Sequence, residues 1–117
     1  MKPLITGGSG ILGKELRKYF PESLCPSHNE LDITNSTLVS DYFSKNDFDM
    51  IIHTAAMTSI RQCESEKNLA WKTNVVWTKN LIDATSESKP NCKFIYISTA
   101  CVFDGHQGMY KESSIPY

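Results

Sequence analysis

Apolar residues occur along the chain in short unbroken runs that alternate with helix-spaced stripes. The runs predict strands, at 2–6, 23–25, 48–54 and 94–98. The stripes predict helices, at 11–20, from a cap at Asn35 or Ser36 through Phe43, and at about 66–85. Strands that alternate with helices indicate βαβ units and a parallel sheet.

This alternation predicts an α/β fold with a Rossmann-like, doubly wound parallel sheet. Right-handed crossovers give the strand order 3-2-1-4-5, and the chain ends after the fifth strand. No helix follows that last strand, although parallel strands are normally buried on both faces. We therefore expect residues 1–117 to form one incomplete dinucleotide-binding domain without a substrate domain. Its open sheet edge invites pairing, so we also expect a homo-oligomer.

A glycine-rich segment, Thr6-Gly7-Gly8-Ser9-Gly10-Ile11-Leu12-Gly13, follows the first strand and opens the first helix. It contains two overlapping patterns, G-x-G-x-x-G from Gly8 and G-x-x-G-x-x-G from Gly7. In this context glycines permit a tight turn and let the backbone approach a pyrophosphate at the helix N-terminus. The segment therefore predicts NAD or NADP binding, and a glycine turn without a ligand is the alternative. No Gly-Lys-Ser/Thr closes the motif, which excludes a P-loop.

The residues after the second strand bear on the choice of cofactor. An acid about 20 residues beyond the glycines typically binds the ribose 2′-hydroxyl of NAD. Glu30 and Asp32 lie near that distance, but the strand ends near Cys25. We therefore expect Ser27 and His28 at this position. Because neither is acidic, the sequence favours NADP over NAD.

Composition narrows the possible partners. A net charge of −1 with scattered basic residues argues against a nucleic-acid or anionic membrane surface. No apolar run approaches the roughly 18 residues that span a membrane. The four cysteines form no C-x-x-C pair and have no zinc-like spacing to histidine, which predicts free thiols and no metal site. We expect a cytoplasmic protein, since no secretory segment precedes the first strand.

Three further segments lie at the carboxyl ends of the strands, where ligands bind in open α/β sheets: Leu31-Asp32-Ile33-Thr34, His53-Thr54-Ala55-Ala56-Met57-Thr58 and Tyr96-Ile97-Ser98-Thr99-Ala100-Cys101-Val102-Phe103-Asp104-Gly105. Together with the glycine turn, they resemble the extended short-chain dehydrogenase/reductase superfamily over the whole chain. Within it, the resemblance is to the dTDP-4-dehydrorhamnose reductases of dTDP-rhamnose biosynthesis. These oxidoreductases transfer a hydride from NAD(P)H to the 4-keto group of a nucleotide-linked deoxysugar. The resemblance implies that this chain is the NAD(P)-binding portion of such an enzyme.

The resemblance also implies a role for individual residues. Cofactor contacts fall at Gly7, Gly10, Ile11 and Leu12 for the pyrophosphate, Asp32 and Ile33 for the adenine, and Ala55, Ala56, Met57 and Thr58 beside the nicotinamide ribose. Thr99 would hydrogen-bond the substrate carbonyl, with Ala100 beside the sugar. Asn74 would tie the long helix to the cofactor loop.

Several of these residues also have a purely structural interpretation. Asp32 could be a turn residue, Ala55 and Ala56 small packing residues, and Thr99 a strand-end hydroxyl. Asn74 could equally be a satisfied polar group of the core. Trp71 and Trp77 are interpreted as helix-packing residues rather than as a platform for a base.

Two departures from the family pattern argue against activity of this chain alone. Ala100 and Cys101 stand where the reductases usually have Asp-Tyr, which puts the sugar in doubt. The Tyr-x-x-x-Lys pair that supplies the proton is absent from the 117 residues, and Tyr117 follows Pro116 too closely to align with the family tyrosine. The alternatives are a non-catalytic NAD(P)-binding regulatory subunit, or an interaction scaffold whose last strand pairs with another chain.

Overall fold

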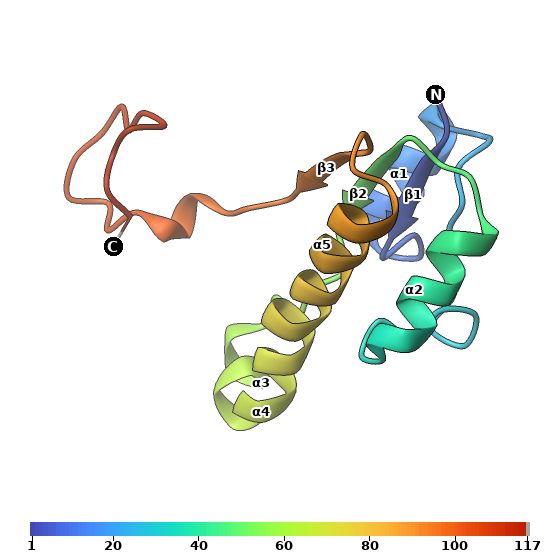
Figure 1. Ribbon diagram of the computed structural model, residues 1–117. Coiled ribbons are helices and arrows are strands. Elements are labelled where there is room, and N and C mark those ends of the chain that lie inside the picture. The colour runs from blue at the N-terminus through green and yellow to red at the C-terminus, as the bar shows by residue number, and fades with distance from the viewer. Residues whose placement is uncertain (117) are drawn as a thin grey trace.

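The computed structural model describes residues 1–116, apart from the side chain of Ala100; Tyr117 lies outside the described residues. The elements in chain order are β1 (Pro3–Thr6), α1 (Ile11–Tyr19), α2 (Ser36–Lys45), β2 (Met50–His53), α3 (Ile60–Ser65), α4 (Lys67–Trp71), the π-helical turn η1 (Lys72–Val76), α5 (Trp77–Ser88), β3 (Lys93–Tyr96) and the 3₁₀ turn η2 (Ala100–Val102). Strands and helices alternate, so the predicted α/β class is confirmed (Figure 1).

The three strands form one parallel sheet in the order β1-β2-β3. On the free side of β1, Leu24 forms a single parallel bridge with Leu4. Ile5 N donates to Leu24 O at 2.8 Å, and Leu24 N donates to Pro3 O at 2.9 Å. The bridge and the three strands thus occupy four neighbouring positions of the expected order.

The outermost strand of the expected five-strand order does not form within residues 1–116. Between Leu24 and α2 the chain forms only turns and loops, so no element fills that position. The predicted strand at 23–25 is reduced to the bridge at Leu24, because Pro26 has no N–H to extend the pairing. A turn follows at once, in which Glu30 N donates to Ser27 O at 3.0 Å. The five-strand prediction is corrected to three strands and a bridge.

Helices cover both faces of the sheet. Leu4 and Ile51 belong to a buried cluster with residues of α2 and α5, which lie together on one face (Figure 1). Ile5 and Ile52 point to the opposite face, where Leu16 of α1 packs against them. This alternation along each strand is the period of two that a sheet buried on both faces requires.

β3 is far more exposed than β1 and β2. Ile95 retains 39% of its accessible surface and Tyr96 retains 54%. The chain beyond β3 runs away from the sheet, as Figure 1 shows. The open edge is therefore present as expected, and self-association through it stays a prediction.

The long helix departs from its predicted form in one respect. Instead of one α-helix over about 66–85, helix α4 leads through the π-helical turn η1 into α5, which ends at Ser88. Trp77 packs against the core, whereas Trp71 is 64% exposed, so its interpretation as a packing residue was wrong. No helix among the described residues has the length and apolarity to cross a membrane.

Candidate functional site

The glycine segment forms a tight turn between β1 and α1. Gly7 adopts a left-handed φ of +68°, and its carbonyl oxygen accepts a hydrogen bond from Gly10 N at 3.0 Å. A Cβ on Gly13 would overlap that same carbonyl oxygen. Gly7, Gly10 and Gly13 therefore meet in space, and Gly8 Cα also lies against the Gly13 position.

The N-terminus of α1 has no side-chain cap. Gly10 occupies the N-cap position, whereas Asn35 caps α2 and Ser59 caps α3 through their side chains. The first N–H groups of an uncapped helix are free to bind a ligand, and the positive end of the helix dipole favours an anion there. The side chains of Ile11, which is 92% exposed, and of Leu12, which is also exposed, carry no polar group. An anion at this turn would therefore be bound by backbone N–H groups.

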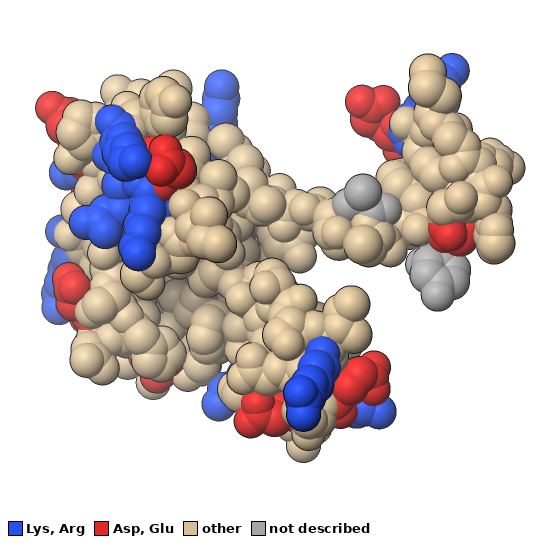
Figure 2. All heavy atoms as spheres, turned by 180° about the vertical axis from the view of Figure 1, so that it is seen from behind, with Lys and Arg blue, Asp and Glu red and all other residues tan. Residues whose placement is uncertain are grey.

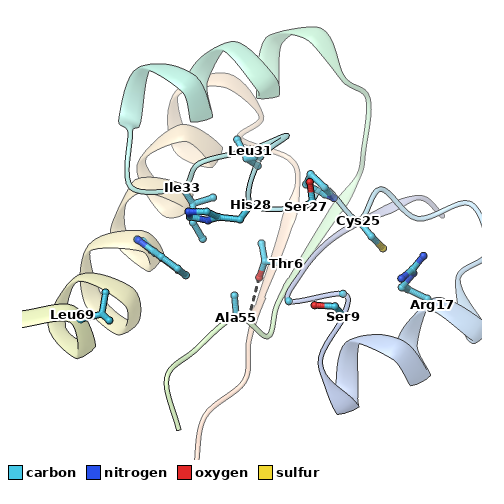
Figure 3. A pocket seen from close by; sticks show the side chains of 14 residues that line it. Thr6, Ser9, Arg17, Cys25, Ser27, His28, Leu31, Ile33, Ala55 and Leu69 are labelled. Carbon is cyan, nitrogen blue, oxygen red and sulfur yellow. Dashed lines mark hydrogen bonds between the residues drawn. The ribbon is translucent and has the colours of Figure 1, made fainter. Parts of the chain in front are cut away.

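A cavity of about 630 Å³ opens beside this turn (Figure 3). Its walls come from the glycine turn, α1, the segment after Leu24, the loop after β2 and the long helix: Thr6, Gly7, Gly8, Ser9, Arg17, Cys25, Pro26, Ser27, His28, Leu31, Ile33, Ala55, Leu69 and Trp77. Cavities of several hundred Å³ accommodate small ligands and cofactors. The position at the carboxyl ends of parallel strands is where doubly wound sheets bind ligands.

The structure brings three of the expected cofactor residues, Gly7, Ile33 and Ala55, to the cavity wall. Gly10, Ile11 and Leu12 begin α1 next to that wall, and Ala56, Met57 and Thr58 continue the loop from Ala55.

Asp32 is not brought to the cavity. Its carboxylate accepts from the Thr34 hydroxyl at 2.6 Å and from Thr34 N at 3.0 Å. These two hydrogen bonds, the hydroxyl first, lower the pKa of Asp32 below its ordinary value. These hydrogen bonds fit the turn-residue interpretation of Asp32, and its contact with the adenine stays a prediction.

No carboxylate lines the cavity among the described residues. Ser27 and His28 stand after the Leu24 bridge, as expected. Glu30, the other acid near the expected spacing, is engaged locally. Its carboxylate accepts from Ser27 N at 3.2 Å while Ser27 Oγ accepts from Glu30 N at 3.3 Å, the reciprocal pairing of a capping box.

A buried histidine joins the ends of β1 and β2 to the long helix. His53 Nδ1 lies 2.6 Å from Thr6 Oγ1, and His53 Nε2 lies 2.9 Å from Thr78 Oγ1. Because the Thr78 hydroxyl donates to Asn74 O at 3.0 Å, it accepts from His53 Nε2–H, which leaves Nδ1 to accept from Thr6. The ring is thus neutral with both nitrogens paired, and burial lowers the pKa of His53 to about 4.

Two asparagines of the long helix hold the loops beside the cavity. Asn74 lies in η1 and binds Met57, the loop residue that follows the cavity-lining Ala55 by two positions. Asn80 Nδ2 donates to Ile33 O at 2.9 Å. Sequence reasoning identified the first of these asparagines and missed the second, whose partner lies 47 residues away.

Thr99 and the segment around it lie outside the cavity lining. The Thr99 hydroxyl oxygen accepts from Cys101 N at 3.2 Å, and the residue is exposed. The expectation for Ala100 concerns a side chain outside the described residues. Among the residues that the structure does describe, no cluster of three His, Cys, Asp or Glu side chains forms a metal site.

The chain is similar to curated and solved proteins over nearly its full length. It is 36% identical over 118 residues to a dTDP-4-dehydrorhamnose reductase of Aggregatibacter actinomycetemcomitans, covering 96% of this chain and 40% of that protein. It is 32% identical over 127 residues to methionine adenosyltransferase 2 subunit beta of Xenopus laevis, covering 99% of this chain and 37% of that protein. The chain thus spans about two-fifths of the length of these relatives.

A solved structure agrees with the sequence similarity. The crystal structure of dTDP-4-dehydrorhamnose reductase from Bacillus anthracis in complex with NADP superimposes with a TM-score of 0.88 at 34% identity, over 98% of this chain and 42% of that one. The family described as RmlD substrate binding domain matches residues 1–117. Since that match covers the entire sequence, and the glycine turn and parallel sheet accompany it, the chain belongs to the RmlD substrate binding domain family.

Proposed function

We propose that this chain is the NADP-binding portion of a dTDP-4-dehydrorhamnose reductase-like oxidoreductase. The observation that carries the proposal is the cavity of about 630 Å³ between the uncapped start of α1 and the segment after Leu24. The pyrophosphate would lie beside Gly7 and Gly10, against the free backbone N–H groups that begin at Ile11, since Gly10 N already donates to Gly7 O. The adenosine would extend past Ser27 and His28 toward Ile33.

The similarity to a reductase solved with NADP supports this assignment. The residues present also fit the group, since the turn offers backbone donors and no acidic side chain among those described lines the cavity. On this proposal, residues 1–117 form a Rossmann domain that binds the dinucleotide.

Isothermal titration of NADPH into the 117-residue chain tests the proposal, with saturable binding as the expected result. Ser9 provides a sharp variant because it is exposed and lines the cavity beside the glycine turn. Ser9→Asp places a negative charge at the proposed pyrophosphate position and should weaken binding at least about tenfold, whereas Ser9→Ala should bind like the wild type. Absence of binding to the wild type, or equal binding by both variants, would contradict the proposal.

For the reductase reaction, NADPH supplies the hydride when bound. We infer that Thr99 would donate a hydrogen bond to the substrate carbonyl, with Ala100 beside the sugar. The Thr99 oxygen accepts from Cys101 N, which leaves its O–H available to donate. General acid catalysis contributes about 10²- to 10⁴-fold, so the 117-residue chain, which contains no Tyr-x-x-x-Lys pair, should turn over a dTDP-4-keto-6-deoxy sugar negligibly. Turnover at ordinary enzyme rates would contradict this.

A second candidate is a non-catalytic NADP-binding subunit of another enzyme. The similarity to a subunit of methionine adenosyltransferase 2 over 99% of this chain favours it. The two candidates differ in what a longer reading frame contains. A Tyr-x-x-x-Lys pair downstream of the glycine turn supports the reductase, and NADPH binding without such a pair and without turnover supports the regulatory subunit.

A further inference from the structure

Arg17 of α1 borders the cavity, although no sequence motif drew attention to it. Its aliphatic stem lies beside Gly8 and Cys25. A Cβ built on Gly8 would stand 3.0 Å from the Cys25 Cβ and 3.5 Å from the Arg17 Cδ. In Figure 3 the Arg17 side chain rises from α1 toward Cys25. The Arg17 side chain therefore lies between the glycine turn and the residues that follow the Leu24 bridge.

The charge around this end of the cavity is positive. A second hollow adjoins the first, shares Arg17 and Cys25 with it, and is also lined by Lys14 and Lys18. Lys18 pairs with Glu15 at 2.7 Å, whereas Arg17 and Lys14 form no ion pair among the described residues. Figure 2 shows Lys and Arg side chains gathered on the face where α1 lies.

The same end of the cavity lacks the acid that would select a free ribose hydroxyl. In doubly wound folds the adenosine ribose lies beyond the end of the second strand, which here is the Leu24 bridge. The carboxylates of Glu30 and Asp32 are bound to Ser27 and Thr34 and do not line the cavity. A carboxylate there would repel a phosphate on the ribose, and a guanidinium attracts one.

We propose that Arg17 binds the 2′-phosphate of the adenosine ribose and makes this chain selective for NADP over NAD. The planar guanidinium presents two parallel N–H donors that match the oxygens of a phosphate dianion. Lys14 raises the local positive potential without lining the cofactor cavity. This inference rests on the proposed function, because it assigns a specificity residue to the same dinucleotide site.

The test compares four dissociation constants by isothermal titration: NADPH and NADH with the wild type and with Arg17→Gln. Because Arg17→Gln removes charge-assisted hydrogen bonds to the 2′-phosphate, it should raise the dissociation constant of NADPH at least about tenfold. The dissociation constant of NADH should change by less than about twofold, since NADH has no 2′-phosphate. Lys18→Gln is the matched control because Lys18 is the next residue, is already paired with Glu15 and lies outside the cofactor cavity.

The fragments adenosine 2′,5′-bisphosphate and ADP separate the two phosphate positions. Arg17→Gln should weaken binding of the bisphosphate. It should leave the affinity for ADP nearly unchanged, because ADP would bind through the glycine turn. Equal losses for both fragments, or no loss of NADPH affinity in a folded Arg17→Gln variant, would overturn the role of Arg17 while leaving the proposed function intact. A wild-type chain that binds neither dinucleotide would overturn both.

Discussion

Asn74 holds the backbone of Met57 at both its donor and its acceptor. Met57 N donates to Asn74 Oδ1 at 2.8 Å, and Asn74 Nδ2 donates to Met57 O at 3.0 Å. The asparagine sits in the π-helical turn η1, and such turns recur at functional sites. The loop after β2, which borders the cavity through Ala55, is thereby fixed to the long helix.

Asn74→Ala should destabilise the chain by about 1–3 kcal/mol, because it leaves two partly buried backbone groups of Met57 without partners. Urea unfolding measures the loss, and hydrogen exchange of the Met57 amide should accelerate. Asn68→Ala is the control, since Asn68 is exposed on α4 and its side chain makes no hydrogen bond among the described residues. An unchanged rate of hydrogen exchange at the Met57 amide in Asn74→Ala would contradict the proposed role of Asn74 in holding this loop.

Gly13→Ala should disrupt the turn between β1 and α1. The added Cβ would overlap Gly7 O and crowd Gly8 Cα, and both are backbone atoms that cannot move aside cheaply. We expect a loss of about 2 kcal/mol or more in the free energy of unfolding, together with loss of NADPH binding. Gly108→Ala, where a Cβ meets nothing within 4 Å, should stay within about 0.5 kcal/mol of the wild type.

The buried His53 should make the chain less stable as the pH falls. Its pKa is lowered from 6.5 to about 4 in the folded chain. Between these values the unfolded chain binds the proton and the folded chain does not, so the free energy of unfolding decreases as the pH falls from about 6.5 to about 4, by up to roughly 3 kcal/mol.

Urea unfolding across that pH range checks this dependence on His53. His53→Gln should flatten the pH profile because it removes the titrating ring. His106→Gln should leave the profile as it is in the wild type, because the His106 side chain is exposed. An equally steep profile in His53→Gln would assign the acid sensitivity to other groups.

Periodicity was sufficient to predict most of the fold. The strands predicted at 2–6, 48–54 and 94–98 are found at Pro3–Thr6, Met50–His53 and Lys93–Tyr96. These segments carry their own signal, because their burial follows from apolar runs bounded by polar residues. The prediction failed at 23–25, where pairing depends on Pro26 and on the turn after it rather than on the apolarity of Leu24.

The candidate site was only partly predictable, because much of it depends on contacts between distant segments. The glycine turn is local and was read directly from residues 7–13. His53 pairs with Thr6 and Thr78, which lie 47 and 25 positions away in the sequence. The spacing of apolar residues cannot predict contacts between such distant positions. Arg17 carried a usable signal: it lies four residues after Gly13, so it shares the helix face that meets the turn.

Trp77 should report ligand binding directly. It lines the cavity, and its ring centroid lies 5.8 Å from that of His28. Its indole Nε1 is the one buried polar side-chain atom among the described residues that has no hydrogen-bond partner. A base that enters the cavity would contact the aromatic surface of Trp77, so the fluorescence of Trp77 should change on binding.

Adenosine 2′,5′-bisphosphate is the probe of choice, because it lacks the nicotinamide that absorbs tryptophan emission over long distances. Its addition should quench the fluorescence of the wild type and of Trp71→Phe, which removes the exposed tryptophan. It should leave Trp77→Phe unchanged, since the chain contains just two tryptophans. Quenching that persists in Trp77→Phe and disappears in Trp71→Phe would place the base away from the cavity and against the exposed face of α4.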